Sequence, residues 1–388
     1  KLNGQTYKEI ATNIGYSIWV VRKWWRVGRD HGLSKLGEPR RGRAESGILA
    51  QFDPKVASKA ELTKRSHPTW GPNRVLIELR SDLELNGLAL PGRSRLSTFF
   101  KQVCPDCVAK RQPRTSDPKG KSRATAVHEE WGMDCQEGIR LSNGEIASIC
   151  NIHDPFGGAP IASKAFSVKT KKRWRKLEVK EYREVLRDAF QEWKTLPDSV
   201  RTDNELRLVG QPASDFPGML TLYLAGLGIK HNFIRPGTPT DQPQLERGHR
   251  TLDNLAFNEQ SLSSLDALQQ ALDHERQIYL QDFPSQASNC NGRPPLKAHP
   301  SLLCPRRIYS RETELSLFSL QRVYEFLAAF TFKRKVSAYG CISLGSQQSF
   351  GRRLFRQLKN KSVTVKCDPS KGEWVVYQRT TDPDKPMI

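Results

Sequence analysis

The stretch GIKHNFIRPGTPTDQPQLERGHRTL, residues 228–252, passes from strand to loop to helix. KHNFI has the composition of a short strand over 230–234, and the Pro and Gly residues of 236–239 predict a loop. Apolar residues then recur at helical spacing, which predicts a helix over 244–258. This helix contains Glu246, so the stretch predicts a carboxylate on the helix that follows a strand.

Two acids upstream occupy related positions. WGMDC predicts a short strand that ends at Asp134, and DSVRTDNE predicts another that ends at Asp203. Two β-rich runs and an amphipathic helix over 179–193 lie between them. Strands alternating with helices predict a mixed α/β fold with a helix-flanked sheet. Asp154, at the end of the second β-rich run, is interpreted as structural.

Asp134, Asp203 and Glu246 together predict a cluster of oxygen donors, the ligand type that Mg²⁺ and Mn²⁺ prefer. Two such ions about 3.5–4 Å apart activate an attacking oxygen and stabilise a leaving oxygen in phosphodiester displacement. Because the chain has 41 acidic residues, three of them alone are a weak signal. Their sequence context makes the signal more specific.

WGMDC, RTDNE and the Pro-Gly-x-Pro loop with its Glu-Arg helix resemble the three catalytic blocks of the DDE integrase and transposase superfamily. HPTWGPNRV resembles the upstream region of bacterial insertion-sequence transposases. The resemblance implies an RNase H-like α/β core, with Asp134, Asp203 and Glu246 as catalytic residues that bind two Mg²⁺ ions, for which Mn²⁺ can substitute. It also implies cutting and joining of transposon-end DNA.

One departure concerns residues 241–243, which read Asp-Gln-Pro where relatives commonly carry Asn-Gly. It affects the helix start and local DNA contacts rather than the triad. Gln242 and Arg250 lie four residues on either side of Glu246, so both are expected to face the DNA end. Alternatively, Arg250 forms only a structural pair with Glu246.

The N-terminal residues 5–27 predict two short amphipathic helices around Gly15, which is the pattern of a helix-turn-helix unit. Residues 1–36 are therefore interpreted as a DNA-binding module that reads DNA through Arg22, Lys23 and Arg26. The alternative is a helical hairpin with a solvated basic face. Residues 37–60 are expected to be a basic linker with DNA contacts from Arg40, Arg41 and Arg43.

The remaining regions complete the predicted domain order. Residues 61–110 predict a second helix-turn-helix module with Arg93 and Arg95 exposed toward DNA, followed by a basic linker over 111–127. The catalytic core is expected over 128–290. Residues 305–380 are β-rich and resemble the small barrel that follows the core of the Mu transposase, with Arg352 and Arg353 as DNA contacts.

Charge is distributed unevenly along the chain. Lys and Arg number 62 against 41 acidic residues, a net charge of +21. Residues 1–127 have 25 basic and 11 acidic residues, residues 128–310 have 23 of each, and residues 311–388 have 14 and 7. Basic flanks around a neutral core predict an anionic polymer as partner. The resemblance implies that this polymer is transposon-end DNA and target DNA.

Other classes are excluded by simpler features. Eight cysteines without an apolar leader argue against a secreted disulfide framework, and no apolar run approaches the 18 residues of a membrane span. The expected location is the bacterial cytoplasm, in association with the nucleoid. Cys104 and Cys107 form half of a zinc motif without a second half, so zinc is a minor alternative.

These features predict a DNA transposase that acts as a homo-oligomer on paired DNA ends, with an accessory ATPase as a possible partner. Two alternatives remain open. One is a DNA-binding regulator without catalysis, derived from a transposase; the other is a metal-dependent nuclease that cuts without joining.

Overall fold

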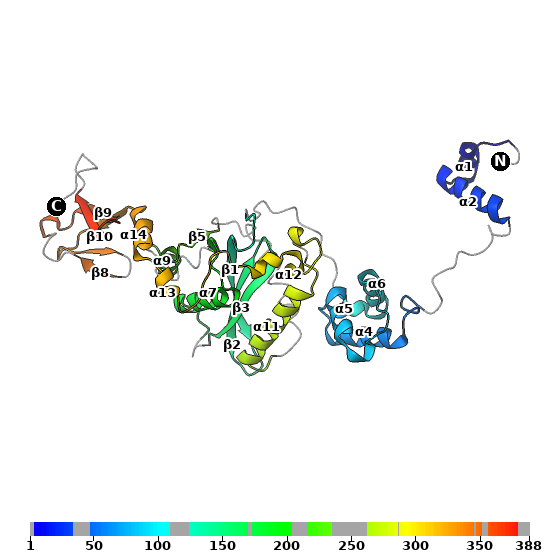
Figure 1. The fold of residues 1–388 in the computed structure, drawn as a ribbon, viewed down its shortest axis with the longest axis horizontal. Coiled ribbons are helices and arrows are strands. Elements are labelled where there is room, and N and C mark those ends of the chain that lie inside the picture. Colours follow the sequence, from blue (N-terminus) through cyan, green and yellow to red (C-terminus); the bar gives the residue numbers. More distant parts are fainter. Residues whose placement is uncertain are drawn as a thin grey trace.

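The structure is a computed structural model (Figure 1). It describes residues 4–33, 47–108, 124–169, 173–203, 216–234, 262–285, 287–344, 347–350 and 356–378.

A mixed five-stranded sheet forms the centre of the fold, with the order β3-β2-β1-β4-β5. The first three strands are antiparallel hairpin neighbours, whereas β4 and β5 run parallel to β1. This order and polarity fit the RNase H-like core that the sequence resemblance implies. The strands are β1 (Glu130–Arg140), β2 (Ile146–Asp154), β3 (Ala159–Ser167), β4 (Ser199–Thr202) and β5 (Lys230–Phe233).

Helices cover both faces of this sheet (Figure 1). The helix α7 (Val179–Trp193) has the bounds that the periodicity predicts, and it buries Val185, Ala189 and Phe190 against one face, together with α9 (Met219–Gly226). On the opposite face, α11 (Leu265–Gln281) buries Leu268 and Leu272 over β2 and β3. Among the described residues, the apolar cover on the face opposite α7 lies over β2, β3 and the end of β1.

The strand β1 is longer than predicted. It continues beyond Asp134 to Arg140 because its second half pairs with β2, with a register irregularity between Gln136 and Ile139. Its pairing with β4 covers only Glu130 to Gly132. The prediction that the strand ends at Asp134 is wrong, although the ladder with β4 does end nearby.

The segment after residue 290 belongs to the same core. Leu302 and Tyr309 are buried in the cluster that contains α7, and Tyr309 contacts the Phe190 ring. The expected core boundary at 290 and barrel start at 305 are therefore wrong, because residues 296–318 add side chains to this cluster. The short helices here are α12 (Pro295–Ala298) and α13 (Glu314–Leu317).

Near the N-terminus, α1 (Tyr7–Ile14) and α2 (Ile18–His31) form a helical pair. Thr6 and Glu9 make a capping box, Ser17 caps α2, and Gly15 adopts the left-handed conformation that the sharp turn requires. The predicted helix, turn and helix are present. A DNA-binding role for them stays a prediction.

A second helical unit contains α4 (Pro54–Ser66), α5 (Pro72–Ser81) and α6 (Arg93–Val103) around their own hydrophobic cluster. Leu49, Val56 and Ala60 are buried in that cluster. The expected linker over 37–60 is therefore wrong for residues 49–60, because their apolar side chains pack into this unit.

The C-terminal region contains α14 (Leu320–Ala328), a three-stranded sheet in the order β10-β9-β6 and a β7–β8 hairpin. Phe332, Ile342, Val363 and Val365 share one hydrophobic cluster that spans both sheets. A closed barrel stays a prediction. The strands are β6 (Phe332–Lys335), β7 (Ile342–Leu344), β8 (Gln347–Phe350), β9 (Ser362–Asp368) and β10 (Glu373–Gln378).

Candidate functional site

The parallel ladder between β1 and β4 brings two predicted catalytic residues together. Glu130 pairs with Ser199 and Gly132 with Arg201, an offset of 69 residues. Asp134 and Asp203 are separated by the same 69 residues, and Asp203 directly follows β4. Extending this register by two residues pairs Asp134 on β1 with Asp203, the residue that follows β4.

Both aspartates lie on the face opposite α7. Trp131 and Met133 on β1 and Val200 on β4 are buried against α7 and its neighbours. Since successive side chains alternate between faces, Asp134 and Asp203 lie on the other side. Glu130 and Arg201 share that side and form an ion pair with a Nη2–Oε2 distance of 2.8 Å, which agrees with the assignment.

Polar side chains continue along this face. Asn232 on β5 donates a hydrogen bond to the same Glu130 Oε2 at 3.3 Å, so one carboxylate links β1, β4 and β5. Asp134 and Asp203 are each half-buried. The face is therefore polar and partly exposed at the two aspartates, which suits a cation with oxygen ligands.

The Asp134 side chain has a defined backbone contact. The Cys135 backbone N–H donates a hydrogen bond of 2.8 Å to Asp134 Oδ1. Cys135 itself faces α7, and its pairing partner Cys150 is fully buried. Burial raises the pKa of the Cys150 thiol well above its usual range, so this cysteine is an apolar core residue rather than a nucleophile.

Asp154 has a structural role, as predicted. Its carboxylate accepts hydrogen bonds from the backbone N–H groups of His128 (2.6 Å) and Gly157 (2.7 Å). Burial raises its pKa to about 6. The carboxylate thus fixes the turn after β2 to the start of β1, and it faces no open surface because it is fully buried.

His128 completes this buried junction. The Trp131 indole N–H donates to His128 Nδ1 at 3.2 Å, so Nε2 carries the proton and donates to the Leu302 carbonyl at 2.8 Å. Burial lowers the pKa of His128, which agrees with a neutral ring. Sequence patterns gave no sign of this junction, because Leu302 is 174 residues away.

A second contact absent from the predictions joins the helical unit to the core. Arg74 on α5 donates hydrogen bonds to both carboxylate oxygens of Glu275 on α11, at 3.1 and 2.9 Å. Their side chains are 2% and 6% exposed, and the guanidinium lies 4.0 Å from the centroid of the Trp70 ring. The helical unit therefore docks on the core through a buried, bidentate ion pair.

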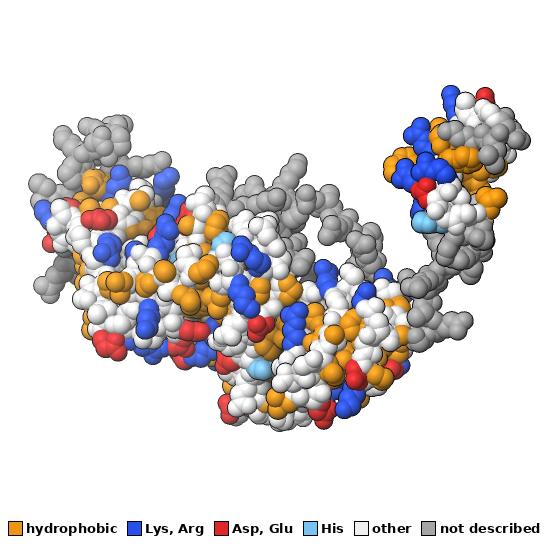
Figure 2. Space-filling model, turned by 45° about the vertical axis from the view of Figure 1, so that its right-hand side comes forward, with side chains coloured by type: hydrophobic (Ala, Val, Ile, Leu, Met, Phe, Trp, Pro, Cys, Tyr) orange, Lys and Arg blue, Asp and Glu red, His pale blue; other side chains and the backbone are white. Residues whose placement is uncertain are grey.

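The predicted DNA contacts fall into two groups. Arg22, Lys23, Arg26, Arg93 and Arg95 are exposed, as expected. Figure 2 shows blue Lys and Arg side chains beside orange hydrophobic ones on the α1–α2 pair at the upper right. The others lie outside the described residues, together with Glu246: Arg40, Arg41, Arg43, Gln242, Arg250, Arg352 and Arg353.

Metal sites in proteins are formed mainly by His, Cys, Asp and Glu side chains. Within the described ranges no three of these residues form a group that could hold a metal ion. Cys104 is buried and Cys107 is half-buried beside α6, so the zinc alternative has two candidate ligands there. For the predicted triad, the described residues supply the pair Asp134 and Asp203.

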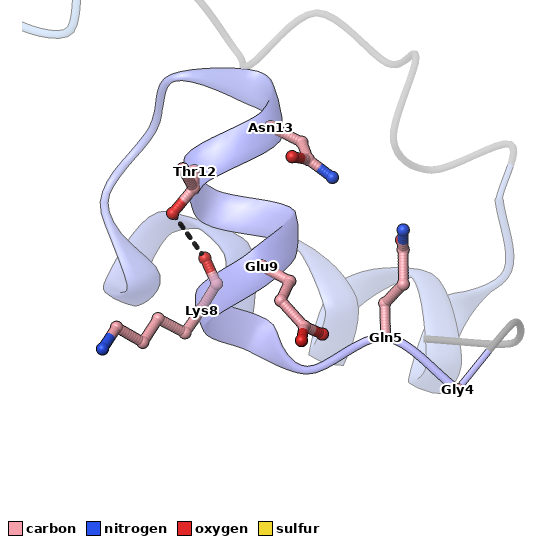
Figure 3. Close-up of a pocket in the computed structure, with 6 residues that line it drawn as sticks. All are labelled: Gly4, Gln5, Lys8, Glu9, Thr12 and Asn13. Carbon is pink, nitrogen blue, oxygen red and sulfur yellow. Dashed lines mark hydrogen bonds between the residues drawn. The ribbon is translucent and has the colours of Figure 1, made fainter.

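A pocket lies beside α1 (Figure 3). Lys8 and Glu9 give it both charges, and the Thr12 hydroxyl donates a 3.0 Å hydrogen bond to the Lys8 carbonyl. Glu9 is engaged in the helix cap, where the Thr6 backbone N–H lowers its pKa. The pocket contains no predicted site residue and is interpreted as part of the helix start.

No protein-family model matches the sequence. The solved structures that this chain resembles include retroviral integrases. The HTLV-2 integrase catalytic core domain in complex with magnesium is 16% identical, over 46% of this chain and 99% of that one, with a TM-score of 0.33. An intasome of simian T-cell lymphotropic virus with the PP2A regulatory subunit B56 gamma is 15% identical, over 84% and 99%, with a TM-score of 0.37.

The catalytic core of BIV integrase is 17% identical, over 45% of this chain and 95% of that one, with a TM-score of 0.29. Because all three TM-scores are below 0.5, the functional assignment rests on the strand register and side chains of this chain. No helix within the described residues is long and apolar enough to span a membrane.

Proposed function

We propose that this protein is a DNA transposase of the DDE class, which cuts transposon ends and joins them to target DNA. The observation that supports the proposal most is the register of β1 and β4, which brings Asp134 and Asp203 to one polar face. In this proposal Glu246 is the third carboxylate.

The donor set suits the divalent cation that such a reaction uses. Asp134 and Asp203 offer hard carboxylate oxygens on a half-hydrated face, and Mg²⁺ prefers such oxygens and retains several water ligands. With Glu246, they would hold two Mg²⁺ ions, or Mn²⁺ in their place. When bound, the cations activate the attacking oxygen and stabilise the leaving one.

The protein's own residues orient this site. The Cys135 N–H holds the Asp134 carboxylate, and the ion pair between Arg201 and Glu130 neutralises a nearby acid that would otherwise compete for the cation. The buried Asp154–His128 contact fixes the start of β1 against the end of β2. Together these contacts orient Asp134 and hold β1 against β2 and β4 before DNA binds.

DNA binding is proposed for the basic flanks. Arg22, Lys23, Arg26, Arg93 and Arg95 are exposed on two helical units and are available to phosphates and bases. Transposon-end DNA is the proposed ligand of these units, and target DNA the second substrate of the core. A homo-oligomer on paired ends is proposed because joining two ends requires at least two active sites in fixed register.

The test is a strand-joining assay with Mg²⁺, labelled end DNA and a target plasmid. Asp203→Asn is expected to abolish joined products while it leaves end binding within about twofold, because it removes a cation ligand and no DNA-binding side chain. Asp273→Asn, an exposed acid on α11, is the matched control and should join normally.

The assay also separates the alternatives. Cut but unjoined ends from the wild-type protein would indicate a nuclease, and binding without either product would indicate a regulator. Joining by Asp203→Asn at the wild-type rate would contradict the assignment of the site.

A further inference from the structure

A row of polar side chains crosses the sheet on the face of the two aspartates. In the antiparallel ladders, Asn151 on β2 lies directly opposite Asp134, and Ser163 on β3 lies directly opposite Asn151. Directly opposed residues share a face of the sheet. The row therefore runs Ser163, Asn151, Asp134 and, through the β1–β4 register, Asp203.

Asn151 is buried without a complete set of hydrogen bonds. Asn151 is 4% exposed. Its Oδ1 has no hydrogen-bond partner in the part of the chain that the structure describes. A buried carbonyl oxygen without a partner is costly, and such an exception calls for an explanation. Here the row leads from this oxygen directly to the proposed cation ligands.

The strand spacing indicates what kind of contact Asn151 can make. In the strand order, β2 and β4 lie on opposite sides of β1. Neighbouring strands are about 4.8 Å apart. A cation between Asp134 and Asp203 is then too far from β2 for direct ligation by the short Asn side chain. A water molecule in the cation's shell would span the gap, and Mg²⁺ usually keeps several waters.

We propose that Asn151 is a positioning residue of the catalytic site: its Oδ1 accepts a hydrogen bond from a water molecule bound to the cation that Asp134 and Asp203 hold. This inference rests on the proposed function. It assigns the buried oxygen a partner, and it makes β2 part of the cation site through the polar row.

The strand β2 also provides a matched control. Ser148 is fully buried and its Oγ likewise has no hydrogen-bond partner among the described residues. Three residues from Asn151, it points to the opposite face of the sheet. A general effect of removing an unpaired polar atom from β2 would therefore be seen at both positions, whereas an effect on the cation would be seen only at Asn151.

The experiment titrates the full-length protein with Mn²⁺ by calorimetry, without DNA, and measures thermal unfolding without metal. Asn151→Leu, which keeps the approximate shape, is expected to raise the Kd for Mn²⁺ about tenfold. Its metal-free melting temperature should equal or exceed that of the wild type, because an unpaired buried oxygen is removed. Ser148→Ala should bind Mn²⁺ with the wild-type Kd, and Asp203→Asn should lose binding.

Two results would overturn different claims. If Asn151→Leu binds Mn²⁺ with the wild-type Kd, the role of Asn151 is wrong and the cation site stands. If the wild type does not bind Mn²⁺, or Asp203→Asn binds it equally well, the proposed site itself is wrong. Should Asn151→Leu not fold, Asn151→Ala is measured instead, with the same tenfold loss expected and an unchanged Kd as the contradicting result.

Discussion

The hydrogen bond from the Cys135 N–H to Asp134 illustrates how single residues prepare the site. A carboxylate held by a backbone donor needs less reordering when a ligand arrives, because its orientation is already fixed. The next residue of this strand, Cys135, packs against the core cluster under α7. Alternation along β1 thus separates an apolar face, packed under α7, from the polar face of the proposed cation site.

His231 provides a pH-sensitive contribution at the residue scale. The ring lies between the hydroxyls of Thr202 (3.0 Å) and Thr221 (2.9 Å), which joins β4, β5 and α9 behind Asp203. Burial lowers its pKa to about 4. The folded protein therefore keeps this ring neutral over a range in which the unfolded chain protonates it.

The contribution of His231 to stability should consequently fall as pH decreases from about 6.5 to about 4, because the unfolded state then binds the extra proton at this ring. His231→Gln removes this titration and is expected to reduce the pH dependence of the free energy of unfolding in that window. Urea unfolding at several pH values measures the slope. An equally steep slope in the variant would show that His231 is not the responsible group.

At the scale of elements, the ladder between β1 and β4 is short but decisive. Only three residue pairs join the strands, yet their register aligns Asp134 with Asp203. Local sequence predicts strands at both positions and the helix α7 between them. Local sequence does not predict which residues of β1 and β4 pair. Pairing between strands 69 residues apart depends on how the intervening β2, β3 and α7 fold.

Other parts of the site were beyond sequence reasoning for the same reason. Asn151 and Ser163 have ordinary strand contexts, and only the pairing of β1, β2 and β3 brings them into one row with Asp134. The resemblance of WGMDC and RTDNE to catalytic blocks predicts the two aspartates of the proposed site without a structure. The resemblance gave no information on the buried contacts of His128 with Asp154 and Leu302, because these residues are far apart in the chain.

The contact between α5 and α11 leads to a prediction at this scale. Arg74→Met is expected to destabilise the protein by about 3–5 kcal/mol, because it leaves the Glu275 carboxylate buried without its partner. Adding Glu275→Leu should restore much of this loss, since both charges are then absent. Arg80→Met, an exposed residue on the same helix, is the control.

Chemical denaturation and limited proteolysis between the helical unit and the core would measure these effects. A single variant as stable as the wild type would show that the ion pair does not contribute to docking.

At the scale of the whole molecule, the uneven charge agrees with the proposed division between DNA recognition and catalysis. Residues 1–127 have a large basic excess, whereas residues 128–310 are balanced. In the proposed transposase, the basic units hold the DNA, and the neutral core brings its carboxylates close to that DNA. A core without a basic excess does not itself attract DNA non-specifically to the active site. The arrangement agrees with a protein that binds first and reacts afterwards.

The affinity of the full chain for end DNA should therefore fall steeply with salt, by at least tenfold between 50 and 200 mM, because phosphate contacts release counterions. Replacing Arg22, Lys23 and Arg26 by Gln should reduce the slope of the salt dependence. Fluorescence anisotropy at several salt concentrations measures it. A slope unchanged in this variant would show that α2 makes no phosphate contacts.

The central claim is that Asp134 and Asp203 jointly bind a catalytic divalent cation. The most direct measurement is an anomalous difference map from crystals of the full-length protein grown with Mn²⁺. The account predicts a manganese peak between the two carboxylates, about 2.0–2.3 Å from an oxygen of each, and its loss in Asp203→Asn. Manganese bound only elsewhere, or a peak that persists unchanged in Asp203→Asn, would contradict it.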